Sequence, residues 1–163
     1  MDLLELSRLE AKAKKLQIES VDLYALTQSV LKRMNKLIEE KGLEITVVHE
    51  DDEYLCDADL ELMRTALVNL ITNALKFADK EIKIEFTKNK KKNTVSIIND
   101  GKMIPVEIIE HIWDEFYKEE SAENQVIKSS GLGLAITKNI LILHNAKYGC
   151  TSVNGNTKFW FTI

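Results

Sequence analysis

The sequence predicts an α+β domain with helices on one face of a mixed sheet. Amphipathic helical segments and β-strand segments both occur along the 163 residues, and several strands follow one another across short turns. Such an order favours a sheet with neighbouring antiparallel strands and helices packed against one of its faces. The length suits one domain with a hydrophobic core of its own.

Composition narrows the class of protein. Hydrophobic residues make up 45% and charged residues 29% of the chain, and the net charge is −4. Because no basic face is evident, nucleic acid is not an expected partner. No stretch approaches the roughly 20 apolar residues of a membrane span, and no signal peptide is visible. Cys56 and Cys150 lack metal-ligand spacing and fit a reducing compartment, although the sequence leaves a disulfide between them open.

Helical periodicity dominates the first half of the chain. Leucines at roughly helical spacing predict that residues 2–17 form a charged helix, whose apolar stripe needs a partner surface. Gly42 is placed to end the next helix, and an acidic turn separates two runs that predict strands. The predicted elements are a helix at 2–17, a strand at 19–22, a helix at 23–40, strands at 43–50 and 53–59, and a helix from about 59 to 78.

The second half predicts hairpins and two further helices. The lysine-rich stretch 88–92 predicts a solvated turn between two strands of a hairpin. Pro105 stands near the start of one helix, and Gly131 and Gly133 open the other. The predicted elements are strands at 82–89 and 93–100, a helix at 104–118, a polar irregular segment at 119–130, a helix at 131–146, and closing strands at 147–155 and 157–163.

One face of the helix predicted at 59–78 carries an unusual set of side chains. At 100° per residue, Asn69, Asn73, Lys76 and Lys80 fall in one stripe opposite the apolar residues, with Phe77 at the border. Asparagine suits an exposed helix position less well than Glu, Lys or Gln. The stripe fits an ordinary surface helix, but amide and ammonium groups in one row can also bind a metal-bound polyphosphate.

Two glycine-containing motifs follow this helix. "IINDGKMIP" (97–105) leaves a strand and turns into a helix, and "SSGLGLAITKN" (129–139) opens another helix. Free amides at a helix start can bind an anion, and glycine lets a ligand approach closely. Each motif is weak alone, whereas the order and spacing of all of them together are specific.

Together these motifs resemble the catalytic and ATP-binding domain of sensor histidine kinases, over about residues 18–163. That family belongs to the Bergerat-fold superfamily with the Hsp90, gyrase B and MutL ATPases. "NLITNALKFA" is similar to its N box, "NDGKMIP" to the first glycine box, "IWDEFYK" to the F box and "SSGLGLAITKNIL" to the second glycine box. The resemblance implies a two-layer α/β sandwich with a mixed, mostly antiparallel sheet, about three helices on one face, and an ATP lid over about residues 102–130.

The resemblance also implies domain boundaries and ligands. Residues 1–18 would be the end of the dimerisation and phosphoacceptor helix with its linker, and residues 19–163 the catalytic domain. ATP and Mg²⁺ are the implied ligands. Asn73 would ligate Mg²⁺, and Phe77 would lie against the base or ribose.

The same resemblance assigns the remaining site residues. Asn69 and Lys76 would contact phosphates, and Lys118 would reach the γ-phosphate, which makes these three the expected catalytic residues. Gly101 would let the adenine pocket close. The other expected nucleotide contacts are Asn99, Met103, Ile104, Phe116, Tyr117, Ser130, Gly131, Leu132, Gly133 and Leu134.

Asn69 also bears on the reaction. The hydrolysing relatives carry a glutamate at this position, and asparagine cannot accept a proton at neutral pH, so ATP is expected to be held for transfer. The three histidines, His49, His111 and His144, lack the context of an acceptor, which is therefore expected upstream of this chain.

The resemblance implies partners as well. They are the dimerisation domain that carries the acceptor histidine and a cognate response regulator. We expect a monomeric isolated domain within a homodimeric kinase, on the cytoplasmic side of a membrane-anchored bacterial sensor.

Three positions depart from the family pattern. Asn99 stands where the adenine-binding aspartate is expected, and Met103 and Ser129 replace usual glycines. The alternative function is therefore a degenerate Bergerat-fold domain that binds nucleotide weakly or not at all and acts as a docking module.

Overall fold

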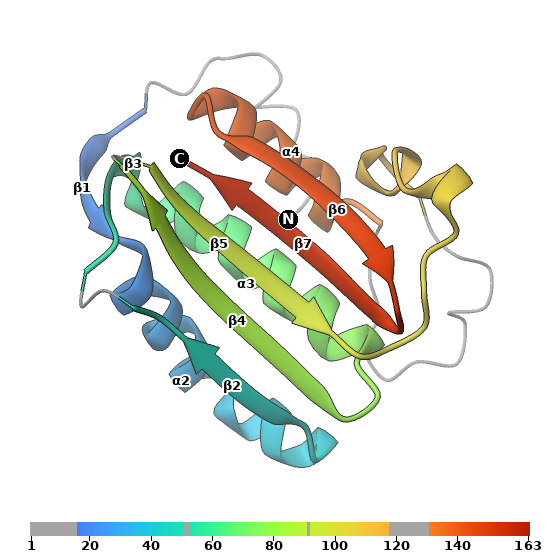
Figure 1. Cartoon of the computed structure of the whole chain (residues 1–163). Coiled ribbons are helices and arrows are strands. Elements are labelled where there is room, and N and C mark those ends of the chain that lie inside the picture. The colour runs from blue at the N-terminus through green and yellow to red at the C-terminus, as the bar shows by residue number, and fades with distance from the viewer. Residues whose placement is uncertain (1–15, 51–52, 91, 118–130) are drawn as a thin grey trace.

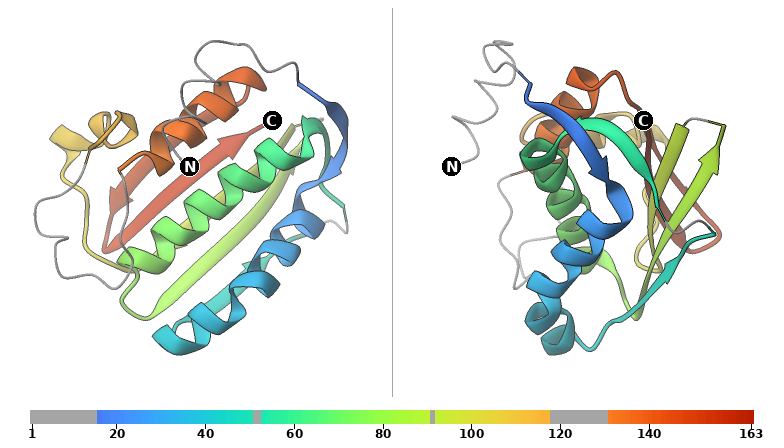
Figure 2. Two further views of the ribbon diagram at one scale, coloured as in Figure 1. Left: turned by 180° about the vertical axis from the view of Figure 1, so that it is seen from behind. Right: turned by 90° about the vertical axis from the view of Figure 1, so that its left-hand side faces the viewer.

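The chain folds into two layers in the computed structural model, which describes residues 16–50, 53–90, 92–117 and 131–163 (Figure 1). Three α-helices cover one face of a five-stranded sheet, and no described helix lies on the other face (Figure 2). The predicted α+β sandwich is confirmed. The helix predicted at 2–17 falls almost wholly outside the described residues and stays a prediction.

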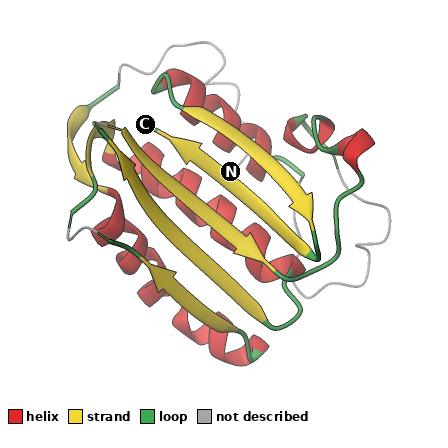
Figure 3. Cartoon of the chain, viewed as in Figure 1, coloured by secondary structure: helices red, strands yellow, loops and turns green. Residues whose placement is uncertain are grey.

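Helices and strands alternate irregularly along the chain (Figure 3). The helices are α2 (Leu23–Lys41), α3 (Leu60–Phe77) and α4 (Gly133–Leu143), with two short 3-10 helices, η1 (Val106–Ile108) and η2 (His111–Trp113). The strands are β1 (Ile18–Asp22), β2 (Glu44–Val48), β3 (Leu55–Asp59), β4 (Glu81–Asn89), β5 (Lys92–Asn99), β6 (Lys147–Val153) and β7 (Asn156–Thr162).

The strands form two sheets. The larger has the order β2-β4-β5-β7-β6, and β1 and β3 form a separate antiparallel pair. Within the larger sheet β2 runs parallel to β4, with Glu44 opposite Glu81, and every other neighbour is antiparallel. The predicted hairpin of β4 and β5 is confirmed, with its turn at the lysine-rich stretch.

Polar groups fix the ends of the helices close to where the sequence predicts them. The carboxylate of Asp59 accepts a hydrogen bond from the backbone N–H of Leu62 at 3.1 Å and so caps α3. Gly42 ends α2 with a φ of 63°, a left-handed conformation that favours glycine. Because α3 ends at Phe77, Lys80 lies beyond the helix, and its predicted place in the polar stripe is wrong.

The main core lies between α3 and the sheet. The apolar face of α3 is fully buried, with Met63, Leu67 and Ile71 at 0% exposure. In Figure 2, α3 lies between α2 and α4 across the middle of the sheet. Alternate strand residues point toward it, as a sheet with one covered face requires. These residues are Ile82, Ile84, Phe86, Val95, Ile97, Phe159 and Phe161.

A second apolar cluster joins α3 to α4. Leu62 and Ala66 of α3 pack against Ile136 and Ile140 of α4, and Leu132 lies in the same cluster. Leu16 and Leu143 are partly buried against it. The cluster fixes the start of α4 beside α3, which matters for the site described below.

Residues 104–117 form two short 3-10 helices, so the α-helix predicted at 104–118 is wrong in its described part. Pro105 is extended, with φ −56° and ψ 140°. Burial of Ile112 and Trp113 then anchors the segment, and the Trp113 ring lies 4.9 Å from that of Tyr148. These local constraints outweigh the helical spacing of the apolar residues.

Both cysteines are free thiols and half-buried. Burial raises the pKa of Cys150 to about 12. Burial, with the nearby charges of Asp57 and Asp22, raises the pKa of Cys56 to about 11. The thiols are therefore protonated and weakly nucleophilic at neutral pH, and the disulfide that the sequence left open is absent.

Candidate functional site

Several elements that are distant in sequence meet at one end of the sheet. The end of α3 lies beside the end of β5, and the turn between β6 and β7 is close by (Figure 1). The start of α4 is fixed against α3 by the second apolar cluster. Most of the described residues that the sequence predicted as a site belong to these elements.

The polar stripe of α3 contributes three half-buried side chains, Asn69, Asn73 and Lys76. The Asn69 side-chain amide donates a hydrogen bond to the backbone carbonyl of Gly133 at 3.1 Å. The Lys76 ammonium lies 4.8 Å from the centre of the Phe77 ring, a cation–π distance. The stripe therefore exists, and it contacts the second glycine motif directly.

The first turn of α4 has the features of an anion site. Its N-cap residue, Leu132, makes no side-chain capping bond, so the leucine side chain does not compete for the first amides of the helix. A Cβ added to Gly133 would lie 3.7 Å from Cγ of Asn69, which is ordinary contact. Glycine at 133 thus keeps the space beside Asn69 open without being sterically required.

The first glycine motif touches the end of α3. A Cβ added to Gly101 would lie 1.6 Å from the carbonyl oxygen of Phe77, which no side chain tolerates. Two backbones are therefore in contact here, as expected for a glycine that lets the pocket close. The contact sets the distance between the polar stripe of α3 and the strand end that carries Asn99.

Asn99 is the most informative side chain of this end. It is 2% exposed, and its side-chain nitrogen finds no hydrogen-bond partner among the described residues. Leaving a buried amide unpaired costs roughly 1–3 kcal/mol. Such a group is expected where a bound molecule completes the hydrogen bonding.

Two further polar side chains, which the sequence reasoning missed, lie in the same row of the sheet. Thr157 of β7 is directly opposite Asn99, and Ser152 of β6 is opposite Thr157. The two hydroxyls are 2.8 Å apart, and Ser152 also accepts a bond from the backbone N–H of Ile104 at 2.8 Å. The sequence does carry one signal for this: the alternation of Thr157, Phe159 and Phe161 places Thr157 on the same face of the last strand as the two phenylalanines.

The segments on either side of residues 118–130 lie in contact. A Cβ added to Gly131 would be 3.1 Å from Cα of Phe116, and both residues have positive φ, 78° and 60°. Phe116 and Met103 are exposed, at 57% and 47%, while Tyr117 is half-buried.

Two predicted site residues, Lys118 and Ser130, lie outside the described residues and stay predictions. Two others have their side chains packed in apolar clusters. Leu132 is buried in the second cluster, and Leu134 packs against the main core. Contact of these two leucines with a nucleotide would have to come from their backbone.

The three histidines have structural surroundings. His49 packs on the ring of Tyr24, with centroids 4.4 Å apart. His111 pairs with Asp114 at 3.1 Å. His144 donates from Nδ1 to the carbonyl of Ile140 at 2.7 Å and accepts the backbone N–H of Asp59 on Nε2.

The described part of the chain contains no group of three His, Cys, Asp or Glu residues that could hold a metal ion. A cation held by an amide oxygen and by phosphates needs no such group, and Asn73 offers that oxygen.

No helix among the described residues is both long and apolar enough to cross a membrane.

The sequence profile of one family matches residues 58–163, and its description is "Histidine kinase-, DNA gyrase B-, and HSP90-like ATPase". The match covers more than half of the chain, which therefore belongs to this family of ATP-binding domains. The resemblance inferred from the motifs is confirmed.

Sequence relatives point to the histidine kinase branch of this family. The chain is 30% identical over 171 residues to the sensor protein kinase WalK of Staphylococcus haemolyticus, which covers 99% of this chain and 27% of that protein. WalK of Staphylococcus saprophyticus is 29% identical, with the same coverage. The chain thus spans about a quarter of the length of these relatives.

Solved structures show the same fold. The catalytic domain of histidine kinase ThkA aligns with a TM-score of 0.81 at 24% identity, over 91% of this chain and 95% of that one. Full-length ShkA in complex with AMPPNP aligns with a TM-score of 0.84 at 26% identity, over 99% of this chain and 34% of that one.

Gly101→Ala is expected to weaken ADP binding at least about tenfold and to destabilise the fold by about 1–3 kcal/mol, because the added Cβ pushes the end of α3 away from β5. Calorimetric titration and urea unfolding measure the two effects. Gly42→Ala is the matched control. It has a positive φ and nothing within 4 Å of the added Cβ, so it should cost roughly 1 kcal/mol of stability and leave ADP affinity unchanged. Full ADP affinity in Gly101→Ala would contradict the account of this contact.

Proposed function

We propose that this chain binds Mg²⁺–ATP and transfers the γ-phosphoryl group to a histidine on the dimerisation domain of a two-component sensor kinase, a domain that lies outside this sequence. The observation that carries the proposal is the buried Asn99 amide nitrogen, which has no hydrogen-bond partner among the described residues, beside the contact of Gly101 with Phe77. The polar stripe of α3 ends at Lys76, next to Phe77. The names of the relatives support the same function.

The base would bind between the end of β5 and the end of α3. Asn99 shares the helix-facing side of β5 with Val95 and Ile97, and Phe77 would close the neighbouring side. Thr157 and Ser152 extend the polar row from Asn99 across β7 and β6. A purine has donors and acceptors on its edge that match this row, and its flat faces suit the apolar surroundings.

The phosphates would lie along the stripe toward the start of α4. Asn69 and Lys76 would contact them, and the amides of the first turn of α4 would add fixed positive partial charge. Asn73 would hold Mg²⁺, which neutralises phosphate charge during transfer. Lys118 remains a predicted contact with the γ-phosphate.

Asn69 favours transfer over hydrolysis. Its amide nitrogen already donates to the Gly133 carbonyl, and an amide cannot take a proton from water at neutral pH. Without a general base, a bound ATP would hydrolyse slowly and wait for an acceptor. Each of the chain's own histidines is engaged in a structural contact, which supports an acceptor elsewhere.

The proposed partners follow from this role. One neighbour is histidine kinase ThkA in complex with its response regulator TrrA, with a TM-score of 0.79. We infer a response regulator as the eventual recipient of the phosphoryl group here too. The domain would work in a homodimeric kinase and face the cytoplasm, where ATP is available.

Phosphoryl transfer is the direct test of this function. A separate dimerisation domain carrying an acceptor histidine should become labelled from radioactive ATP when mixed with this chain, weakly because the domains are not tethered. Asn73→Ala should abolish the label. Acid-labile phosphate on His49, His111 or His144 of the chain alone would contradict the proposal. If the chain binds no nucleotide at all, the docking-module alternative is favoured.

The metal assignment can be tested by itself. Asn73→Ala should lose the part of ADP affinity that depends on Mg²⁺, about tenfold to a hundredfold, because a buried polar contact is worth roughly 1–3 kcal/mol. Thr72→Ala, one position earlier on α3, serves as the control. Calorimetry with and without Mg²⁺ decides the matter, and a variant with its full Mg²⁺ response would refute Asn73 as a ligand.

With asparagine at position 99, the domain should discriminate less sharply between adenine and guanine nucleotides. An amide can accept from the adenine amino group or, when flipped, donate to the O6 of guanine, whereas a carboxylate accepts only and binds roughly twice as strongly. Asn99→Asp should therefore bind ADP more tightly and reject GDP more firmly. Competition of both nucleotides for a fluorescent analogue measures this. Equal discrimination by wild type and variant would show that another group recognises the base.

A further inference from the structure

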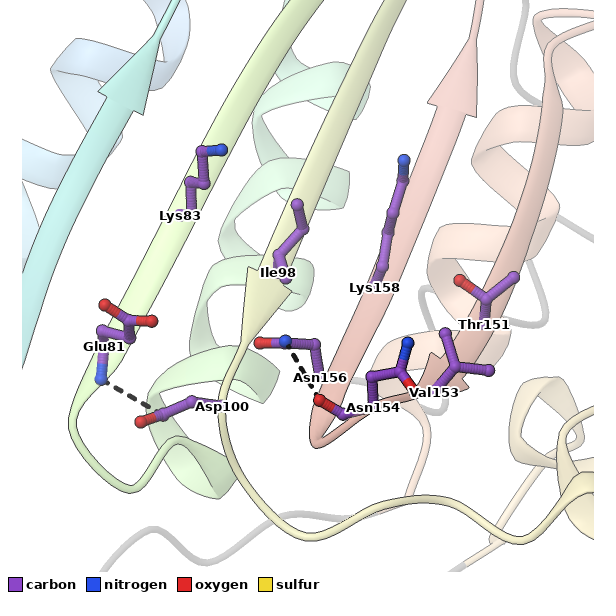
Figure 4. Close-up of a pocket in the computed structure, with 9 residues that line it drawn as sticks. All are labelled: Glu81, Lys83, Ile98, Asp100, Thr151, Val153, Asn154, Asn156 and Lys158. Carbon is purple, nitrogen blue, oxygen red and sulfur yellow. Dashed lines mark hydrogen bonds between the residues drawn. The ribbon is translucent and has the colours of Figure 1, made fainter.

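Asp100, the first residue after β5, lines a hollow on the helix-free face of the sheet (Figure 4). The carboxylate of Asp100 accepts hydrogen bonds from three consecutive backbone N–H groups, those of Asp79, Lys80 and Glu81, at 3.0 to 3.1 Å. Figure 4 shows the bond to Glu81 at the edge of a hollow on the helix-free face. These amides form the turn that leads from α3 into β4.

This clamp joins the two segments between which the base is proposed to bind. The turn begins two residues after Phe77, where α3 ends. Gly101, which touches the Phe77 carbonyl, directly follows Asp100. The turn is also tied to β2, since Lys80 accepts the backbone N–H of Glu44 at 2.9 Å. Moving Asp100 would therefore move the end of α3 relative to Asn99.

We propose that Asp100 is a positioning residue for the base pocket: by clamping the turn at residues 79–81, it holds Phe77, at the end of α3, in register with Asn99. The inference rests on the proposed nucleotide binding and assigns Asp100 no contact with the nucleotide.

The charge of Asp100 suits this role. Burial raises its pKa, but the hydrogen bonds from Lys80, Glu81 and Asp79 outweigh burial and hold the pKa below its ordinary value. The carboxylate is thus ionised at neutral pH, and its bonds are charge-assisted.

In the described part of the chain, no neighbouring cation pairs with the Asp100 carboxylate in competition with the turn amides. The hollow beside it has a volume of about 410 Å³, and its charged lining residues are Glu81, Lys83 and Lys158. Lys83 is paired with Glu85 at 2.6 Å. No salt bridge between Asp100 and either lysine is seen among the described residues, so its bonds to the turn are the interactions that position it.

The test compares Asp100→Ala, Asp100→Asn and the control Asp57→Asn, which makes the same chemical change at an exposed position of β3. Calorimetry should show that Asp100→Ala weakens ADP and adenosine by the same factor, about tenfold, because the base pocket is disturbed and the phosphate contacts are not. Asp100→Asn keeps one acceptor oxygen and should recover part of that loss. The Mg²⁺-dependent gain in ADP affinity should be unchanged. Full adenosine affinity in a folded Asp100→Ala would overturn the proposal.

A pH profile separates the clamp from general loss of stability. Because the folded-state pKa is lowered, the clamp stabilises the protein above the unfolded pKa of about 3.9 and is lost as pH falls through the folded value. The stability difference between wild type and Asp100→Asn should therefore shrink below about pH 3.9. Glu81, Lys83 and Lys158 lie beside position 100 in both proteins, so they do not account for this difference. A difference that persists undiminished in acid would contradict the clamp.

If wild type binds neither ADP nor adenosine, the proposed function fails but the clamp remains testable. In that case the amide resonances of residues 79–81 and the side-chain amide resonances of Asn99 should still shift together in Asp100→Ala and not in Asp57→Asn. Unchanged Asn99 resonances in Asp100→Ala would show that the clamp does not position the pocket.

Discussion

The candidate site depends on one contact between two stretches of backbone, Gly101 against the carbonyl of Phe77. It places the last turn of α3 directly beside the end of β5. Because no side chain intervenes, no rotamer change can widen or narrow the gap. The end of α3 that carries Lys76 and Phe77 is thus held beside the strand end that carries Asn99 by direct backbone contact between two rigid elements, as precise binding requires.

Local patterns in the sequence predicted most of the helices and strands. The capping carboxylate of Asp59 and the left-handed Gly42 fixed helix ends to within about a residue, as expected where backbone groups need partners. The asparagine stripe was evident because helical spacing places Asn69, Asn73 and Lys76 on one face. The motif order then identified the family.

Interactions between distant residues account for what the sequence did not show. The periodicity of 43–50 predicts a strand but not that it pairs in parallel with β4, since partner choice is decided by packing. The apolar spacing of 104–118 suggested a helix, but Pro105 and the anchoring of Trp113 impose 3-10 turns. Thr157 and Ser152 lie in the row of Asn99 only because the turn that joins β6 to β7 lies opposite the end of β5, and the alternation along β7 alone does not mark that juxtaposition.

The pleat of β5 separates two tasks that are adjacent in the sequence. Asn99 lies on the face that carries the buried Val95 and Ile97, and Asp100 lines the hollow on the helix-free face (Figure 4), so a substitution of Asn99 leaves the bonds of Asp100 to the turn intact. The base-facing residue can therefore diverge among descendants of this sequence in single steps while the turn beside it stays closed. A single inserted residue in β5 would be far less tolerated, because the slip would exchange the two faces and disable both tasks at once.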